Sequence, residues 1–311
     1  MNKKLISIVT PTYNEIENID ELLRRIQSSI NALLNYDFEI IVIDNCSTDG
    51  TAERLKELAK KDSRLKVILN ARNFGHIRSP YYGILQSRGE ATIYLASDLQ
   101  DPPEIIPDFL REWGAGYKLV MAIKPVSKSN PIMHFFRKSY YRLISVISDL
   151  DIINDSTGFG LYDKVVVDKI REISDPYPFL RGLICELGYE VKLIPFIQQR
   201  RLAGITKNNF YTLFDIAMLG IVSHSKVPIR VASIVGIILG VLSVIVAFIF
   251  LILKIIFWEA FPIGSAPIVI GLFFLFGVQL FFIGILGEYI GSIHGYVQNR
   301  PIVVEKERIN F

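Results

Sequence analysis

The sequence of 311 residues contains little cysteine, and its two cysteines, Cys46 and Cys185, do not have the spacing of a metal site. This scarcity argues against a disulfide framework and is typical of a reducing compartment. The net charge is only +3, which gives little reason to expect a nucleic-acid partner. Neither glycine-rich pattern of a phosphate-binding loop occurs. The apolar run before Pro11 is too short for a secretory signal peptide.

Charge is also missing from two long segments near the C-terminal end. Val231–Leu253 has 23 residues without a formal charge, and Ala266–Gly287 has 22 in which Gln279 is the one strongly polar side chain. About 20 apolar residues suffice for a helix to cross the hydrocarbon core of a bilayer. The pattern therefore predicts two C-terminal transmembrane helices, in a hairpin over 231–290. The alternative is a pair of buried core helices, which rarely run so long without charge.

The basic residues around these segments predict their orientation. Lys226 and Arg230 precede the first segment, and Arg300, Lys306 and Arg308 follow the second. By the positive-inside rule, both termini lie in the cytoplasm of a multi-pass protein of the plasma (inner) membrane. Small residues spaced four apart, such as Gly236 and Gly240, are compatible with helix packing within one chain or in a homo-oligomer.

The first 125 residues alternate short runs of Ile, Val and Leu with helical patterns. Alternation of this kind predicts an α/β fold, with a Rossmann-like and mostly parallel sheet covered on both faces. Asn14 and Glu17 resemble a capping box at the start of the first helix. We expect a cytosolic domain over 1–207, an interfacial amphipathic region over 208–230 and a cytosolic tail over 291–311. The apolar stripe within 210–222 would equally suit a core helix of the soluble domain.

Polar residues follow the predicted strands, at the edge where ligands bind in such sheets. Pro11–Glu15 offers an aromatic ring and a carboxylate that could hold a nucleobase, although an ordinary turn with a helix cap would look the same. Asp44 follows the second strand and could bind base or ribose. Asp98 and Gln100 follow the fourth strand and could hold a hard divalent cation, Mg²⁺ or Mn²⁺, against two phosphates.

As a set, four segments resemble the successive motifs of family 2 inverting glycosyltransferases with the GT-A fold. These segments are Pro11–Glu15, Asp44–Thr51, Arg72–Gly75 and Asp98–Glu104. The sequence Asp-Leu-Gln-Asp-Pro-Pro-Glu and the two C-terminal spans resemble the polyisoprenyl-phosphate glycosyltransferases, which include bactoprenol glucosyltransferases and dolichol-phosphate mannose synthases. The resemblance covers essentially the whole chain, and each motif alone is weak.

The resemblance implies roles for the donor side of the site. The residues expected to hold the nucleotide are Pro11, Tyr13, Glu15, Asp44, Asn73 and Ser97. Asp98 and Gln100 match the position of the metal and the diphosphate. The family usually has aspartate two residues before Asp98, where this chain has Ala96, so one metal or nucleotide contact is in question.

The acceptor side is expected to be basic because the implied acceptor is a lipid phosphate. The residues expected to bind this phosphate or the diphosphate are Lys124, Lys128, Arg137, Arg200, Arg201 and Lys207. A membrane-facing basic collar is the alternative use of these charges. Asp155 matches a carboxylate that often acts as general base, but a lipid phosphate is already ionised, so we expect Asp155 to orient the acceptor or metal. A turn-capping role would also suit Asp155. Asp98, Asp155 and Arg201 are the expected catalytic residues.

The resemblance thus implies inverting transfer of a hexose to polyprenyl phosphate at a membrane, with UDP-glucose as the favoured donor. One alternative is a processive polysaccharide synthase, but Leu202 stands where the Gln-x-x-Arg-Trp motif of those enzymes has tryptophan. The other is a catalytically silent membrane scaffold that retains the fold, for which Ala96 is the one supporting feature.

Overall fold

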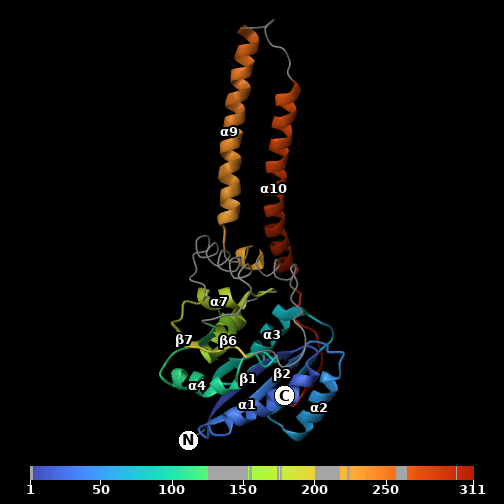
Figure 1. Ribbon diagram of the computed structural model, residues 1–311, viewed down its shortest axis with the longest axis vertical. Helices are drawn as coiled ribbons and strands as arrows, with labels where there is room; N and C mark the ends of the chain where they lie inside the picture. The colour runs from blue at the N-terminus through green and yellow to red at the C-terminus, as the bar shows by residue number, and fades with distance from the viewer. Residues whose placement is uncertain are drawn as a thin grey trace.

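An α/β body carries two long helices that project from it, as the computed structural model shows (Figure 1). The residues that the structure describes are 3–124, 153, 156–173, 175, 177–199, 218–222, 225–256, 265–298 and 300–311.

One mixed sheet of eight strands forms the centre of the body, in the order β7-β5-β6-β4-β1-β2-β3-β8. Neighbouring strands pair in parallel except at β4–β6, β5–β6 and β3–β8, so β6 and β8 run against the other six. This confirms the expected α/β fold with a mostly parallel sheet. The strands are β1 Lys4–Thr12, β2 Tyr36–Asp44, β3 Leu65–Asn70, β4 Ala91–Tyr94, β5 Leu119–Ile123, β6 Ser156–Asp163, β7 Val191–Pro195 and β8 Glu305–Ile309.

Helices cover both faces of the sheet because alternate strand residues are apolar on each face. Ile40 and Val42 of β2 pack with α1 and α4, whereas Ile41 and Ile43 pack with α3 and α6. In Figure 1, α1, α2 and α4 lie on the side of the body remote from the projecting helices, and α3 and α7 lie nearer to them. The helices of the body are α1 Ile16–Ile30, α2 Thr51–Lys61, α3 Gly75–Leu85, the 3₁₀ helix η1 Pro103–Ile105, α4 Ile106–Gly114, α6 Lys164–Glu172 and α7 Leu180–Glu186.

The strand order reverses at β1, which has β2 on one side and β4 on the other. In open α/β sheets, ligands bind outside the carboxyl ends of the strands at such a point. Thr12 at the end of β1 is directly paired with Asp44 at the end of β2, and the Leu95 N–H donates to the Val9 carbonyl 3.1 Å away. The fold therefore brings the ends of β1, β2 and β4, which carry three of the predicted motifs, to one edge.

The predicted capping box at the start of α1 is wrong. Glu15, not Asn14, is the N-cap residue of α1, and its side chain makes no cap hydrogen bond; the Ile16 N–H at the start of the helix donates instead to Asp49 Oδ2 at 3.1 Å. Asn14 has a positive φ of 54°, and its Oδ1 accepts a hydrogen bond of 2.8 Å from the Thr48 N–H. The Asn14 side chain therefore stabilises the turn after β2 and not the start of α1.

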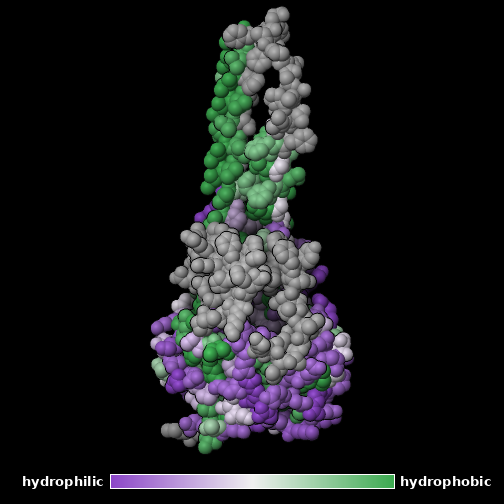
Figure 2. Space-filling view, viewed as in Figure 1, coloured by the Kyte–Doolittle hydropathy of each residue, from purple (hydrophilic) through white to green (hydrophobic). Residues whose placement is uncertain are grey.

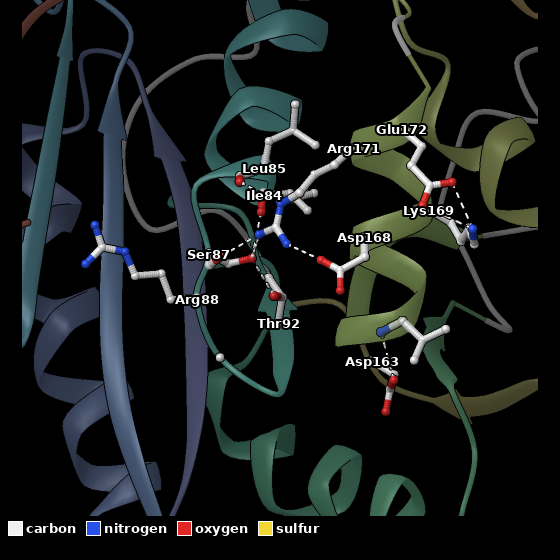
Figure 3. Close-up of polar contacts among 12 residues, drawn as sticks. Ile84, Leu85, Ser87, Arg88, Thr92, Asp163, Asp168, Lys169, Arg171 and Glu172 are labelled. Carbon is white, nitrogen blue, oxygen red and sulfur yellow. Dashed lines mark hydrogen bonds and ion pairs between the residues drawn. The ribbon is translucent and has the colours of Figure 1, made fainter.

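Arg171 of α6, the helix that follows the antiparallel strand β6, links that helix to the segment between α3 and β4. Figure 3 shows its guanidinium pointing toward the connection between α3 and β4, where it donates to the Leu85 carbonyl at 3.1 Å and to the Ser87 carbonyl. Asp168 on the preceding turn of α6 accepts from Arg171 at 2.5 Å and holds its orientation. Arg171 thus satisfies carbonyls at the end of α3 that have no intrahelical partner.

Strand β8 follows the projecting helices and returns to the body, where it pairs antiparallel with the edge strand β3. The Asn310 amide then donates to the carbonyls of Ala59 and Leu65 at 2.8 and 2.9 Å. Residues 291–311, expected to form a cytosolic tail, thus contain a strand that no sequence pattern predicts. Covering β3 removes an exposed edge that would otherwise invite pairing with other chains.

The projecting helices are α9, Val227–Ile256, and α10, Ser265–Val297. Figure 2 shows hydrophobic side chains over both, in contrast to the hydrophilic far end of the body. By length and composition, the part of the chain that the structure describes has one candidate membrane span, Phe274–Val297, with mean hydropathy 1.7; Val227–Leu242 of α9 is apolar but shorter. The interfacial region expected at 208–230 lies largely outside the described residues.

Candidate active site

The segment after β1 is fixed by hydrogen bonds to the segment after β2. The Asn14 N–H donates to Ser47 Oγ at 2.8 Å, and the Glu15 N–H donates to Thr51 Oγ1 at 3.1 Å. Glu15 is 8% exposed, and its Oε2 accepts from Asn18 Nδ2 at 2.6 Å. Pro11 and Tyr13 are half-buried at the same edge. These bonds place four of the six expected nucleotide contacts, Pro11, Tyr13, Glu15 and Asp44, around the adjacent ends of β1 and β2.

Asp44 is buried at the end of β2, at 1% exposure. Burial raises the pKa of its carboxyl group, and the nearby Asp49 raises it further, whereas hydrogen bonds from Ser47 oppose this rise. The Ser47 hydroxyl donates to Asp44 Oδ1 at 2.5 Å and the Ser47 N–H to Oδ2 at 3.0 Å. These donors orient the carboxylate, so that it could accept further hydrogen bonds from a ribose or base only in one fixed direction.

Asn45 joins the ends of β2 and β3, and the sequence analysis missed it. Its Nδ2 donates to Asn73 Oδ1 at 2.9 Å and to the Gly75 carbonyl at 3.1 Å. Its Oδ1 accepts from the Phe74 N–H at 2.8 Å and from Asn70 Nδ2 at 3.1 Å. The amide thereby holds the turn that presents the exposed Asn73 beside the other nucleotide candidates. A polar residue directly after a strand-end aspartate was the one available signal.

The turn after β4 presents Asp98 and Gln100. Leu99 between them has a positive φ of 59° and is 1% exposed, so its side chain is buried while its two neighbours are half-buried. The Gln100 N–H donates to Asp98 Oδ1 at 3.2 Å, which leaves the other oxygen without a hydrogen bond among the described residues. Ser97, the remaining nucleotide candidate, is 6% exposed. The turn therefore offers Asp98 with one carboxylate oxygen for a ligand.

Asp101 lies beneath this turn, at 4% exposure, and its Oδ2 accepts from the Ala96 N–H at 3.3 Å. Burial raises the pKa of Asp101 to about 6; the positive charge of Lys124 lowers it and the charge of Asp98 raises it. The hydrogen bond to Ala96 supports a structural role for Asp101 in the turn.

The chain after β7 also reaches this turn, a contact that no local pattern predicted. Gln198 Nε2 donates to Gln100 Oε1 at 2.9 Å, and the Gln199 N–H lies 3.4 Å from the Gln100 carbonyl. Arg25 of α1 donates to Gln199 Oε1 at 3.2 Å while it forms a two-pronged ion pair with Glu104, at 2.8 and 2.6 Å. The segment that leads directly into Arg200 is thereby held against Gln100.

Of the remaining acceptor and catalytic candidates, Lys124 lies within the described residues. Lys124 is half-buried at the end of β5, where its charge acts on Asp101. The candidates that lie outside the described residues are Lys128, Arg137, Asp155, Arg200, Arg201 and Lys207.

The expected metal position can be tested by its donor atoms. The described residues contain no group of three His, Cys, Asp or Glu side chains that could hold a metal ion. Asp98 and Gln100 are oxygen donors, as a hard cation such as Mg²⁺ prefers, and such ions often bind through one or two protein ligands plus substrate phosphates. The two side chains therefore fit a cation that is held jointly with a diphosphate.

Comparison of the sequence with known proteins identifies a family and several relatives. The model of the glycosyl transferase family 2 matches residues 7–171. The uncharacterized glycosyltransferase YkcC of Bacillus subtilis is 33% identical over 302 residues, which cover 96% of this chain and 92% of that protein. The SfII prophage-derived bactoprenol glucosyl transferase of Shigella flexneri is 31% identical over 304 residues, 97% of each.

Among solved structures, the mannosyltransferase PcManGT of Pyrobaculum calidifontis, in complex with GDP-Man and Mn²⁺, superposes with a TM-score of 0.47 at 15% identity. That superposition covers 71% of this chain and 63% of the other. The family model spans more than half of the chain, from β1 to α6, and so includes the strand ends where the candidate site lies. The mostly parallel α/β sheet is the GT-A fold that the motifs implied, and the chain belongs to glycosyl transferase family 2.

Proposed function

We propose that this glycosyltransferase transfers a hexose, favoured as glucose from UDP-glucose, to a polyprenyl phosphate with inversion at the anomeric carbon. The observation that carries the proposal is the meeting of three strand ends, with Tyr13, Asp44 and Asp98, on a body attached to long apolar helices. Relatives of nearly the same length that are named bactoprenol glucosyl transferases support the lipid acceptor.

The donor side follows from the ends of β1 and β2. Tyr13 offers a ring for stacking on the base, and Glu15 and Asp44 offer carboxylates to its N–H groups or to the ribose hydroxyls. Asn73, whose side chain accepts a hydrogen bond from Asn45, would be a further contact to the nucleotide. Because Asp44 is already oriented by Ser47, little ordering is needed when the nucleotide binds.

The chemical step is a single displacement. A lipid phosphate oxygen forms a bond to the anomeric carbon, the bond from that carbon to the diphosphate breaks, and the nucleoside diphosphate leaves with the electron pair. Asp98 and Gln100 would hold a divalent cation, Mg²⁺ or Mn²⁺, whose charge stabilises the leaving diphosphate. The acceptor is already an anion, so no strong general base is required of Asp155.

The acceptor side is proposed to be basic and to face the bilayer. Lys124, Lys128, Arg137, Arg200, Arg201 and Lys207 would draw the lipid phosphate to the sugar. The position of Gln198 and Gln199 against Gln100 supports this, since Arg200 and Arg201 follow directly in the chain. Positioning and charge neutralisation would supply most of the acceleration.

We further propose that α9 and α10 both span the plasma membrane, with the body and both termini in the cytoplasm, where nucleotide sugars are made. The apolar surface of α9 and the basic residues that flank the pair support two spans. Self-association through the small residues of these helices is compatible with this arrangement.

The test is sugar transfer by the purified full-length chain. Labelled UDP-glucose or GDP-mannose is supplied with polyprenyl phosphate, with and without Mg²⁺ or Mn²⁺. A lipid-linked monosaccharide that requires the cation is expected. A long polymer would instead indicate a processive synthase, and no product with any donor would indicate a silent scaffold.

Asp98→Ala sharpens this test. Its removal is expected to lower kcat by at least roughly 10²-fold, the usual cost of losing one electrostatic contact to the transition state. Asp37→Ala, which removes an exposed carboxylate at the start of β2, is the matched control and should retain full activity. Equal activity of the two variants, at unchanged melting temperature, would exclude Asp98 from the site.

A further inference from the structure

Three arginines from distant parts of the chain meet where α10 enters the body. Arg72 follows β3, Arg78 lies in α3, and Arg300 follows α10. Arg78 Nη2 donates to the carbonyl of Pro301, the next residue after Arg300, at 2.6 Å. Arg72 and Arg78 also share one aromatic partner, since their guanidinium carbons lie 4.1 and 5.4 Å from the ring centre of Phe74. The return of the chain from α10 therefore assembles this arginine cluster.

The arginine cluster has no acidic counterpart. None of the three side chains forms an ion pair with a carboxylate among the residues that the structure describes. Burial lowers the pKa of the Arg78 guanidinium; the nearby Tyr177 raises it, and the positive charges of Arg72 and Arg300 lower it further. Proteins rarely hold like charges together at a partly buried site unless an anion joins them.

One donor in the cluster is buried and unused. The Nε atom of Arg78 has no hydrogen-bond partner within the described part of the chain, although it is closed off from solvent. Buried N–H groups are almost always paired with protein, water or a bound group. Arg72 and Arg300 are exposed and lie near enough for their charge to act on Arg78, so an anion at the cluster would meet positive charge from both.

The position of Arg300 relates the arginine cluster to the bilayer surface. The apolar span of α10 ends at Val297, three residues earlier, which limits the separation to about 10 Å of extended chain. The polar headgroup layer on each side of the hydrocarbon core is about 5–7 Å thick. In Figure 1, α3 lies on the side of the body nearest the base of α10. Arg300 therefore lies within reach of lipid headgroups.

We propose that Arg72, Arg78 and Arg300 bind the phosphate of an anionic membrane phospholipid. Guanidinium groups suit this ligand because two parallel N–H donors match two phosphate oxygens. The inference rests on the membrane location proposed above and is independent of sugar transfer. This arginine cluster is separate from the basic residues proposed for the acceptor, since it is built from β3, α3 and the chain after α10.

The test counts bound lipids on the full-length chain. The detergent-solubilised protein is titrated with phosphatidylglycerol, with phosphatidylcholine as the neutral reference, and adducts are measured by native mass spectrometry without any sugar donor. Arg300→Gln is expected to weaken phosphatidylglycerol binding roughly fivefold, the usual effect of one basic residue near an anionic surface. Arg78→Gln should weaken it roughly tenfold or more, because a charged hydrogen-bond donor is lost.

Arg111→Gln is the control, since it removes another exposed arginine, from α4, which is ion-paired with Asp108. Because Arg300 is exposed, its variant keeps the test decisive even if Arg78→Gln misfolds. Parallel titrations with polyprenyl phosphate and with inorganic phosphate identify the source of the phosphate. The proposal is overturned if phosphatidylglycerol binds the Arg300 variant as tightly as the Arg111 control, or if only one of the other two ligands responds.

Discussion

Glu39 is a carboxylate in the middle of the sheet, at 3% exposure, and every partner around it is a donor. Ser7 and Lys66 donate at 2.5 Å, and the Arg88 N–H donates at 2.8 Å. Burial alone would raise the pKa of Glu39, but these hydrogen bonds outweigh burial and hold the pKa below its usual value. The ionised form is therefore the one that the fold stabilises.

Glu39→Gln is expected to lower the free energy of unfolding by about 2–3 kcal/mol at pH 7, because Lys66 loses its charged partner. A depressed pKa stabilises the fold above the unfolded pKa of glutamate, about 4.3, and this contribution is lost as the pH falls through the lower folded value. The deficit of the variant should thus shrink in acid. Chemical denaturation at pH 7 and below pH 4 measures it, with the exposed Glu90→Gln as control. A deficit independent of pH would contradict the assigned charge.

At this scale, some site residues were predictable and others were not. Asp44 directly follows an apolar run and Asp98 follows one with only Ser97 between, and the geometry of parallel strands alone brings such residues to one edge. Asn45 and Gln198 gave no comparable signal, because each acts through partners far away in the sequence. Their roles depend on how turns pack against one another, which a local pattern does not contain.

At the scale of elements, the central strands and helices were predictable from the sequence, because apolar residues recur along each of them at the spacing of a strand or of a helix. Strands β1 to β5, for example, all fall within the first 125 residues, where alternation of strands and helices was predicted. Strand β8 was missed because its residues, Glu-Lys-Glu-Arg-Ile, contain one apolar side chain and resemble a solvated tail. Its pairing comes from backbone hydrogen bonds to β3 and from side chains such as Tyr82, whose hydroxyl donates to Glu305 at 2.9 Å.

Asn310→Ala tests whether β8 is part of the stable fold. Asn310 has a positive φ of 62° and donates to three backbone carbonyls, so the variant should lose about 1–2 kcal/mol of unfolding free energy. Asn310→Gly loses the same bonds without the backbone strain and should lose less. Denaturant titration of the full chain compares both with Lys306→Ala, an exposed position on the same strand. If all three variants match the parent, β8 does not contribute to stability.

At the scale of the whole molecule, the orientation of the two long helices makes a prediction about chemical accessibility. Ser265 begins α10 at the end remote from the body, while Cys46 and Cys185 lie within the body (Figure 1). With two spans, Ser265→Cys in a Cys46→Ser, Cys185→Ser background should react with a membrane-impermeant maleimide in intact cells, and the native cysteines of the parent should not. Protection of position 265, or labelling of the parent before lysis, would contradict a hairpin.

The return of the chain through Arg300 into β8 means that the body is joined to α10 by a segment that pairs with β3, and to α9 by a separate segment of the chain. A catalytic domain on a single linker could rotate about that linker and sweep its opening around the membrane normal. With two attachment points, such rotation is blocked and only tilting about the line between them remains. In the proposed membrane arrangement, the donor site would be kept at a nearly constant height above the bilayer, so a long-chain acceptor would have one direction of approach.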